Sequence, residues 1–355
     1  MNQIQDIVKT YYGETLSGTS DLKTDACTTT DRPALHVSAA LAAVHDEVAG
    51  RYYGCGLAIP SVLEGLKVLD LGCGAGRDVF ALAKLVGPNG HVTGVDMTDA
   101  QLDVAQAHEA WHAEQFGYAA PNTRFAKGYL ETLGELDLEP GSFDLIISNC
   151  VINLCTDKPE VFRQAHNLLK PGGELYFSDV YADRRIPADL AADPVLYGEC
   201  LSGALYWGDF LAIAKQSGFT DPRTVNHRRL GIIDPALIRK LGPIRFASVT
   251  ARLIKLEGLD PACEDYGQAV IYQGGIEGME QVFELDTEHR IEAGRVFPVC
   301  GNTLAMLMDT RFAPYFDVVG DGATHFGTFP GCAAPDVFAG SVEETTPASP
   351  GGCCG

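Results

Sequence analysis

Four cysteines have the residue type and the surroundings to bind a soft ion. They are Cys27, Cys55, Cys150 and Cys200, and each lies in a predicted loop, strand end or cap segment. Thiolates are the preferred ligands of soft, thiophilic centres. A cysteine can also act as a small hydrophobic side chain, so each one taken alone is open to a structural interpretation. Their grouping around one glycine-rich loop favours a chemical role for the four together.

The glycine-rich loop reads Asp70-Leu-Gly-Cys-Gly-Ala-Gly-Arg-Asp78 and stands between a predicted strand and a predicted helix. Glycines there let the backbone turn tightly and approach a ligand closely. A dinucleotide fingerprint would need a glycine at position 77, which is arginine here. Asp96 ends the next predicted strand, where an acid can accept hydrogen bonds from both hydroxyls of a ribose. This spacing disfavours a nicotinamide cofactor.

This arrangement resembles the class I methyltransferases, which bind S-adenosylmethionine. The resemblance implies that the loop lies under the methionine and ribose, that Asp96 holds the ribose and that Met97 packs on the adenine. It also implies that Asn149 faces the methyl end. The donor-binding residues that we predict are Tyr12, Asp70, Gly72, Cys73, Gly74, Gly76, Arg77, Asp96, Met97, Gly128, Tyr129, Glu131 and Asn149.

Strands alternate with helices through the first half of the chain. This alternation predicts βαβ units and a parallel sheet. The fold class is therefore α/β: a Rossmann-like class I methyltransferase sheet with helices on both faces, a cap, and a small C-terminal α+β domain. Predicted strands are 67–71, 91–96, 123–126, 143–148 and 174–180, and predicted helices are 36–50, 78–86, 99–116 and 159–169.

Four regions follow from this pattern. Residues 1–183 form the donor-binding domain, and residues 184–257 form a cap and complete the sheet, with strands predicted at 223–230 and 245–255. Residues 258–340 form the small C-terminal domain. The composition of residues 341–355 is typical of a flexible tail that carries Cys353 and Cys354. Adjacent thiols there, or Cys332, would suit delivery of a soft ion or be dispensable.

Six segments of the chain resemble those of arsenite methyltransferases. The separations between the four cysteines, 28, 95 and 50 residues, fit that family too. The resemblance implies that residues 184–257 are an arsenic-binding cap and that Cys150, Cys200 and Cys55 bind As(III). The lone pair of the arsenic would attack the donor methyl without a general base. Our hypothesis for the redox step is that Cys27 and Cys55 supply electrons by forming a disulfide, which thioredoxin or glutathione would reduce. The segments are 20–27, 51–57, 70–78, 148–154, 173–181 and 198–203.

Composition limits the partners of the chain. Its formal net charge is −21, and a nucleic-acid-binding protein needs a basic face, so we expect no nucleic-acid partner. We find no signal peptide and no apolar run long enough to span a membrane. The odd number of cysteines, eleven, argues against a closed disulfide framework. We therefore expect a cytoplasmic protein, and a monomer.

Two alternative functions remain open at this point. A class I methyltransferase that acts on a small organic molecule would explain the glycine loop and leave the cysteines incidental. A thiol-rich protein that sequesters metalloids would explain the cysteines and leave the loop unexplained. The sequence favours methylation of arsenite and then of methylarsenite, because this function uses both features.

Overall fold

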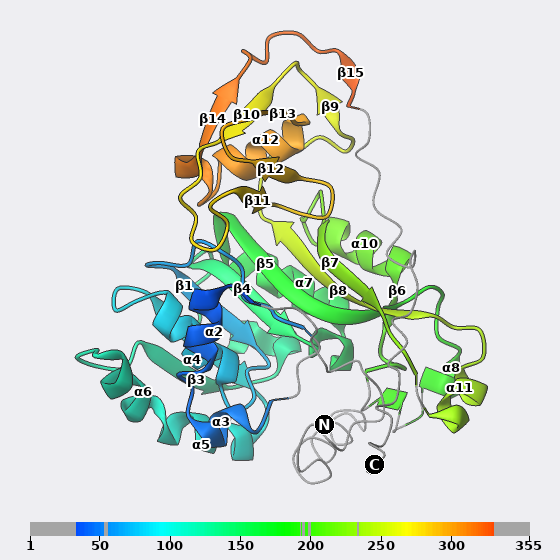
Figure 1. Ribbon diagram of the computed structural model, residues 1–355. Coiled ribbons are helices and arrows are strands. Elements are labelled where there is room, and N and C mark those ends of the chain that lie inside the picture. Colours follow the sequence, from blue (N-terminus) through cyan, green and yellow to red (C-terminus); the bar gives the residue numbers. More distant parts are fainter. Residues whose placement is uncertain are drawn as a thin grey trace, which may run out of the picture.

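The computed structural model describes residues 33–52, 56–191, 193, 196–197, 200–232 and 234–329. An eight-stranded sheet forms its centre, in the order β3-β2-β1-β4-β5-β8-β7, with the short β6 paired to β5 (Figure 1). The strands are β1 (Lys67–Leu71), β2 (His91–Asp96), β3 (Thr123–Lys127), β4 (Phe143–Asn149), β5 (Leu169–Ala182), β6 (Leu205–Tyr206), β7 (Arg223–Arg229) and β8 (Phe246–Ile254).

The first five strands are parallel, and their central residues are almost fully buried. Such strands need apolar side chains on both faces because helices cover both. Val37, Phe80 and Leu102 of α2, α4 and α5 pack in one core cluster, and Phe162 and Phe210 of α7 and α10 pack in another. The helices are α2 (Leu35–Leu41), α3 (Asp46–Ala49), α4 (Arg77–Leu85), α5 (Asp99–Ala107), α6 (Glu109–Phe116), α7 (Lys158–Leu168), α8 (Ala188–Ala191), α10 (Trp207–Gln216) and α11 (Pro235–Leu241), with 3-10 turns η3 (Leu130–Glu135) and η4 (Ile152–Leu154).

Strand β8 runs antiparallel to both of its neighbours, β5 and β7. Every residue of β8 is buried. The two strands predicted after residue 220 therefore complete the sheet, as the sequence indicates.

Two predicted helices are each broken in the structure. The predicted helix 36–50 divides because His45 has a non-helical backbone. Its Nδ1 accepts a hydrogen bond from Glu47 N and so caps the N-terminus of α3. The predicted helix 99–116 divides at His108, whose φ and ψ are −104° and 2°. The His108 ring stacks on His45, and its Nε2 lies 3.1 Å from a Glu47 carboxylate oxygen. These contacts with α3 hold His108 outside helical geometry.

A buried histidine beside this break makes stability depend on pH. His112 Nδ1 lies 2.8 Å from the carbonyl oxygen of His108, while its Nε2 accepts from the backbone N–H of His45. Both contacts fit the neutral ring, and a proton on Nε2 would face another N–H. Burial chiefly lowers the pKa of His112 to about 4, and the neighbouring rings of His108 and His45 add to this effect.

We therefore expect the free energy of unfolding to fall as the pH falls from about 6.5 towards 4. The unfolded chain takes up a proton on His112 in this window before the folded protein does. Urea unfolding should show a loss on the order of 2 kcal/mol between pH 7 and pH 4.5. His112→Gln, which keeps one donor and one acceptor, should flatten that part of the profile. An unchanged slope in this variant would assign the pH dependence to other groups.

The C-terminal unit is a small α+β structure that packs on one end of the sheet (Figure 1, yellow to orange). Tyr272, Phe283 and Phe312 form its core together with Ile254 of β8. Its elements are β9 (Glu264–Asp265), β10 (Ala269–Tyr272), β11 (Val282–Glu284), β12 (Arg290–Glu292), β13 (Val296–Pro298), α12 (Gly301–Met308), η5 (Ala313–Tyr315), β14 (Phe316–Val319) and β15 (Gly327–Thr328).

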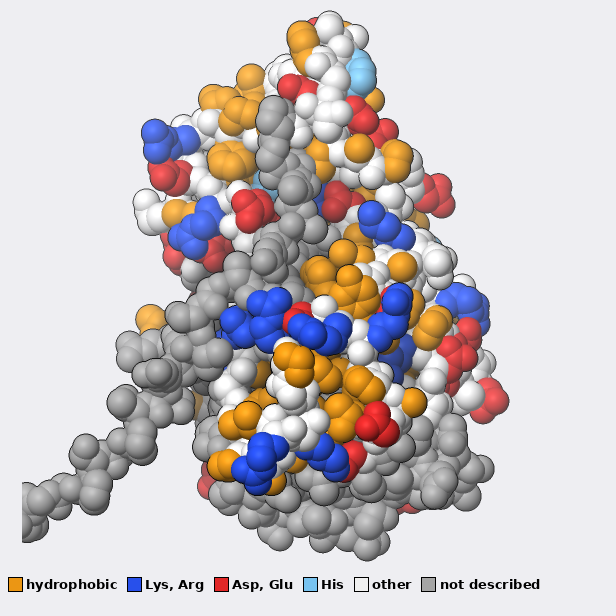
Figure 2. All heavy atoms as spheres, turned by 90° about the vertical axis from the view of Figure 1, so that its right-hand side faces the viewer, with side chains coloured by type: hydrophobic (Ala, Val, Ile, Leu, Met, Phe, Trp, Pro, Cys, Tyr) orange, Lys and Arg blue, Asp and Glu red, His pale blue; other side chains and the backbone are white. Residues whose placement is uncertain are grey.

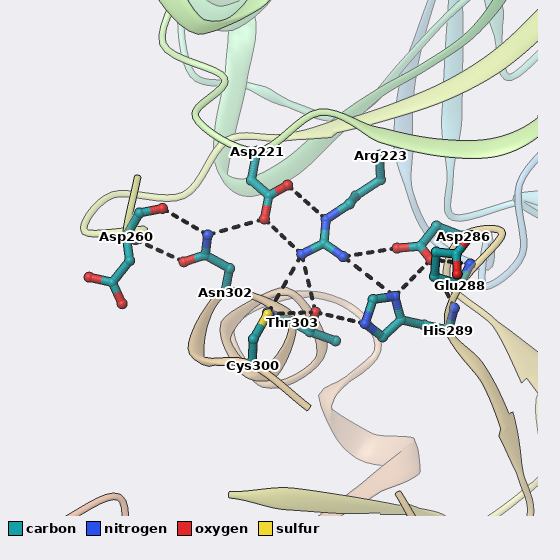
Figure 3. A network of polar contacts seen from close by, with 9 residues as sticks. All are labelled: Asp221, Arg223, Asp260, Asp286, Glu288, His289, Cys300, Asn302 and Thr303. Carbon is teal, nitrogen blue, oxygen red and sulfur yellow. Dashed lines mark hydrogen bonds and ion pairs between the residues drawn. The ribbon is translucent and has the colours of Figure 1, made fainter. Parts of the chain in front are cut away.

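A buried polar network joins this unit to the sheet (Figure 3). The Arg223 guanidinium of β7 lies 2.7 Å from an Asp221 oxygen and 3.0 Å from an Asp286 oxygen. It also donates to Thr303 Oγ1 of α12. Burial alone would raise the pKa of Asp286, but a hydrogen bond from His289 and the charges of His289 and Arg223 lower it to about 2.

We expect Arg223→Met to destabilise the protein by about 3–5 kcal/mol, because it removes the arginine partner of the buried Asp286 carboxylate and of the partly exposed Asp221. Chemical denaturation of the full chain measures this loss. Arg295→Met is the matched control, since Arg295 pairs with the carboxylate of Glu292 and both side chains are exposed. Exposed pairs contribute less than about 1 kcal/mol. Equal losses in the two variants would contradict a special role for the network.

The surface facing the viewer in Figure 2 carries lysine and arginine side chains interspersed with hydrophobic ones. In the segments between β5 and β8, Arg185 pairs with Asp209, and Arg184 and Arg245 both pair with Asp183. Two carboxylates thus pair with three of the arginines in these segments. In the described ranges, no helix is long and apolar enough to cross a membrane.

Candidate active site

The glycine loop joins β1 to α4, and each of its three glycines has a left-handed backbone. Their φ angles are 77°, 53° and 89° at Gly72, Gly74 and Gly76. A Cβ at Gly72 would lie 2.5 Å from Val151, and one at Gly76 would lie 2.9 Å from Phe125. A Cβ at Gly74 would meet open space. The first and third glycines are thus needed for packing, and the second presents bare backbone to a ligand.

Asp96, at the end of β2, is fixed by the loop that faces it. One carboxylate oxygen accepts from Gly74 N at 2.9 Å, and the other accepts from Thr98 N at 2.8 Å. Burial raises the pKa of Asp96, and these backbone hydrogen bonds oppose that rise. Each oxygen retains a further lone pair, which suits the two adjacent hydroxyls of a ribose.

A pocket opens beside this loop at the carboxyl ends of the parallel strands, where open α/β sheets bind ligands. It is lined by the predicted donor-binding residues Asp70, Gly72, Cys73, Gly74, Arg77, Asp96, Met97, Gly128, Tyr129, Glu131 and Asn149, and by Cys150. Gly76 packs behind the loop instead. Tyr12, Cys27 and Cys55 lie outside the described residues.

Other residues that line the pocket are absent from the sequence-based prediction. They are Arg51, Tyr52, Thr98, Gln101, Val151, Leu154 and Cys155. Ala75, Asp78 and Leu130 also line the pocket, but they lie inside the predicted loop 70–78 or between the predicted residues Tyr129 and Glu131. Arg51 and Tyr52 belong to the same segment as Cys55, and Cys155 follows Cys150 by five residues. The proximity of Tyr52 to Cys55 in the sequence could have indicated that Tyr52 lies near the site. The sequence gives no sign of the turn that brings Cys155 to the pocket.

Cys150 and Cys200 have an unusual backbone geometry. Their φ angles are 58° and 59°, and among the described residues only Val62 joins them as a non-glycine with positive φ. The Sγ of Cys200 lies 3.7 Å from the carbonyl oxygen of Cys150, so the structure brings them together across 50 positions of sequence. Left-handed backbone costs about 1–3 kcal/mol at a non-glycine residue and gathers at functional sites.

The side chains of both cysteines are shielded from solvent. Cys150 is 3% exposed and Cys200 is fully buried. Cys150 lines the pocket and donates its backbone N–H to Ser178 O of β5 at 2.8 Å. It takes part in a disulfide. Its sulfur must therefore be reduced to a thiolate before it can bind a soft ion.

A buried carboxylate supports the turn that follows Cys150. Asp179 accepts from both the backbone and the side chain of Asn153, at 3.0 and 2.7 Å. Burial raises the pKa of Asp179 to about 6, against the effect of these hydrogen bonds. Asp179 does not line the pocket, and none of the described lining residues is histidine. Asp179 thus acts on the turn after Cys150 and not directly on the pocket.

Comparisons with known proteins agree on what this chain resembles. A methyltransferase domain model matches residues 63–218, and a model of the arsenite methyltransferase C-terminal domain matches residues 266–355. An arsenite methyltransferase of Aquipseudomonas alcaligenes is 59% identical over 329 residues, which cover 93% of this chain and 94% of the relative. The chain belongs to the arsenite methyltransferase family. An arsenite methyltransferase of Homo sapiens is 43% identical over 99% of this chain and 97% of the relative.

A solved structure in the arsenite methyltransferase family confirms the predicted fold class. The crystal structure of an arsenic(III) S-adenosylmethionine methyltransferase from Chlamydomonas reinhardtii is similar with a TM-score of 0.81 and 48% identity. The similarity covers 84% of this chain and 100% of that chain. The predicted resemblance is thus confirmed, while the predicted roles of individual residues and the four-region division stay predictions.

Proposed function

We propose that this protein methylates trivalent arsenic, first arsenite and then methylarsenite, with S-adenosylmethionine as the methyl donor. The observation that carries the proposal is the placement of Cys150 and Cys200. Both cysteines have a left-handed backbone, and the Cys200 thiol lies against the Cys150 carbonyl oxygen at the strand end. Cys150 lines the pocket that also holds the glycine loop and the acid of a methyltransferase. Family membership supports the same substrate and donor.

Different residues of this chain would bind the donor and the arsenic. The Gly74 backbone and Asp96 would hold the donor, which supplies an electrophilic methyl group when it is bound. Thiolates of Cys150 and Cys200, with Cys55 as a third, would hold As(III) through bonds that its soft character favours. The arsenic lone pair would then form a bond to the methyl carbon, and the demethylated donor would leave as a thioether. Positioning of the two reactants is the main contribution of the protein.

Turnover requires a reductant. Methylation formally oxidises arsenic from As(III) to As(V), and two electrons return it to As(III). We propose that Cys27 and Cys55 supply them by forming a disulfide, which a cytoplasmic thiol such as thioredoxin or glutathione reduces by exchange. Repeated turnover of Cys27→Ser with only monothiols would contradict this role. A monomer suffices for the reaction as proposed.

The test is methyl transfer from labelled S-adenosylmethionine to arsenite in the presence of reduced thioredoxin. We expect labelled mono- and dimethylated arsenic. Donor binding without label in arsenic would instead favour a methyltransferase of small organic molecules. Arsenite binding that is unaffected by the donor, with no transfer to any acceptor, would favour a metalloid-sequestering protein.

A further inference from the structure

Two histidines and a glutamate from distant segments meet where α3 packs beside α5 (Figure 1). They are His45, Glu47 and His108, and one possible ligand atom of each lies within 4.8 Å of those of the other two. His45 caps α3, Glu47 belongs to it, and His108 lies at the break between α5 and α6. In the described part of the chain, no other three histidine, cysteine or carboxylate side chains gather this closely.

The ring of His108 is hydrogen-bonded to the carboxylate of Glu47. Its Nε2 lies 3.1 Å from Glu47 Oε2, and the ring nitrogen is the donor because a carboxylate only accepts. Two ligands about 2.1 Å from a tetrahedral zinc ion would lie about 3.4 Å apart, so a small shift admits an ion between these atoms once the ring carries its proton on Nδ1. The other oxygen of Glu47 faces Arg51 at 3.6 Å, which keeps the carboxylate anchored.

The ring of His45 supplies a third ligand because it stacks on His108. The two ring centroids are 3.9 Å apart and the planes differ by 26°. To bind one ion, the rings would open from this angle by rotation about side-chain bonds. Nδ1 of His45 accepts from Glu47 N, and a neutral imidazole has one acceptor nitrogen. An ion on His45 would therefore replace this hydrogen bond with a metal–nitrogen bond.

A buried third histidine, His112, holds the backbone of both histidine ligands in place. Its Nε2 accepts from His45 N at 3.1 Å, and its Nδ1 lies 2.8 Å from the carbonyl oxygen of His108. The His112 ring also stacks on Phe80 in the core. The two segments that carry the ligands are thus held together before any ion binds, which lowers the cost of assembling a site.

We propose that His45, Glu47 and His108 form a site for a divalent transition-metal ion such as Zn²⁺. Two imidazole nitrogens and one carboxylate oxygen suit such ions, whereas Ca²⁺ and Mg²⁺ prefer oxygen ligands alone. Three protein ligands leave a fourth position for water. The ion would join α3, which leads into Arg51, to α5, which contains Gln101, and both of these residues line the donor pocket. This site is separate from the proposed arsenic site and does not depend on it.

Titration of the full-length protein with Co²⁺ tests the site, because Co²⁺ takes the same ligands as Zn²⁺ and absorbs visible light. The cysteines of this chain can also bind Co²⁺, so the readout is the difference between wild type and Glu47→Gln, a change at a half-exposed side chain. We expect wild type to bind one further equivalent, at least about a hundredfold more tightly, since even the partners of metal ligands contribute about 10- to 100-fold in affinity. The difference spectrum should lack a thiolate-to-cobalt band. Coincident titrations, or a thiolate band in the difference, would overturn the site.

His108→Gln should lose the same equivalent of Co²⁺, because it removes a second ligand of the same ion. His325→Gln is the matched control: His325 Nε2 lies 2.8 Å from a Glu264 oxygen, but this pair belongs to no group of three among the described residues. It should bind as much Co²⁺ as wild type. Retention of the equivalent by His108→Gln, or an equal loss in His325→Gln, would contradict a site built from these three residues.

Discussion

Cys150→Ser is expected to bind S-adenosylmethionine normally and to lose arsenic methylation by about a thousandfold or more. Serine is nearly isosteric with cysteine and bears the same cost of a left-handed backbone, so folding should be retained. Its oxygen is a hard ligand, however, and a poor partner for As(III). Calorimetry with the donor and label transfer to arsenite measure the two properties on the same preparation.

Cys263→Ser is the control for this variant. Cys263 lies in the C-terminal unit and lines a different pocket, so this change should leave methylation of arsenic intact. Efficient methylation of arsenite by Cys150→Ser would refute the thiolate site at the end of β4. Loss of donor binding in that variant would mean that Cys150 supports the donor pocket and not arsenic alone.

Asp96→Asn is expected to raise the dissociation constant of the donor about a hundredfold. Hydrogen bonds to a charged group contribute about 1.5–3 kcal/mol, and the amide nitrogen would also face the N–H of either Gly74 or Thr98. The affinity for arsenite measured without donor should not change. Equilibrium dialysis with labelled S-adenosylmethionine measures the loss.

Asp99→Asn is the matched control, because Asp99 lies three residues further on and pairs with Lys127 at the surface. Exposed pairs contribute little, so donor affinity should be unchanged. Equal donor affinity in wild type and Asp96→Asn would place the ribose elsewhere in the pocket.

The parallel core was predictable because its signals are local. Val68, Leu69 and Leu71 in β1 mark a strand buried on both faces, and the glycine loop after it marks the ligand-binding edge. The same logic placed Asp96 and Asn149 at strand ends, where the pocket lies. These features depend on residue type and order along the chain, which the sequence states directly.

Features that depend on contacts between distant segments were not predictable. The break at His108 follows from its contacts with His45 and Glu47, more than 60 positions earlier. The pairing of Asn149 with Gly56 spans 93 positions. No pattern of hydrophobic residues encodes either contact. The left-handed backbone of Cys200 could not be predicted either, because a cysteine in the sequence does not indicate a positive φ.

The left-handed backbone of Cys150 and Cys200 lowers the stability of the fold at the two residues proposed to bind As(III). Glycine adopts such φ angles without the steric cost that a side chain pays, so Cys200→Gly would relieve strain even as it removes a thiol. A chain selected only to fold would carry glycine or asparagine at both positions. The two residues proposed to bind As(III) therefore stand where a side chain costs stability, and a search for stabilising substitutions in this protein would tend to remove them.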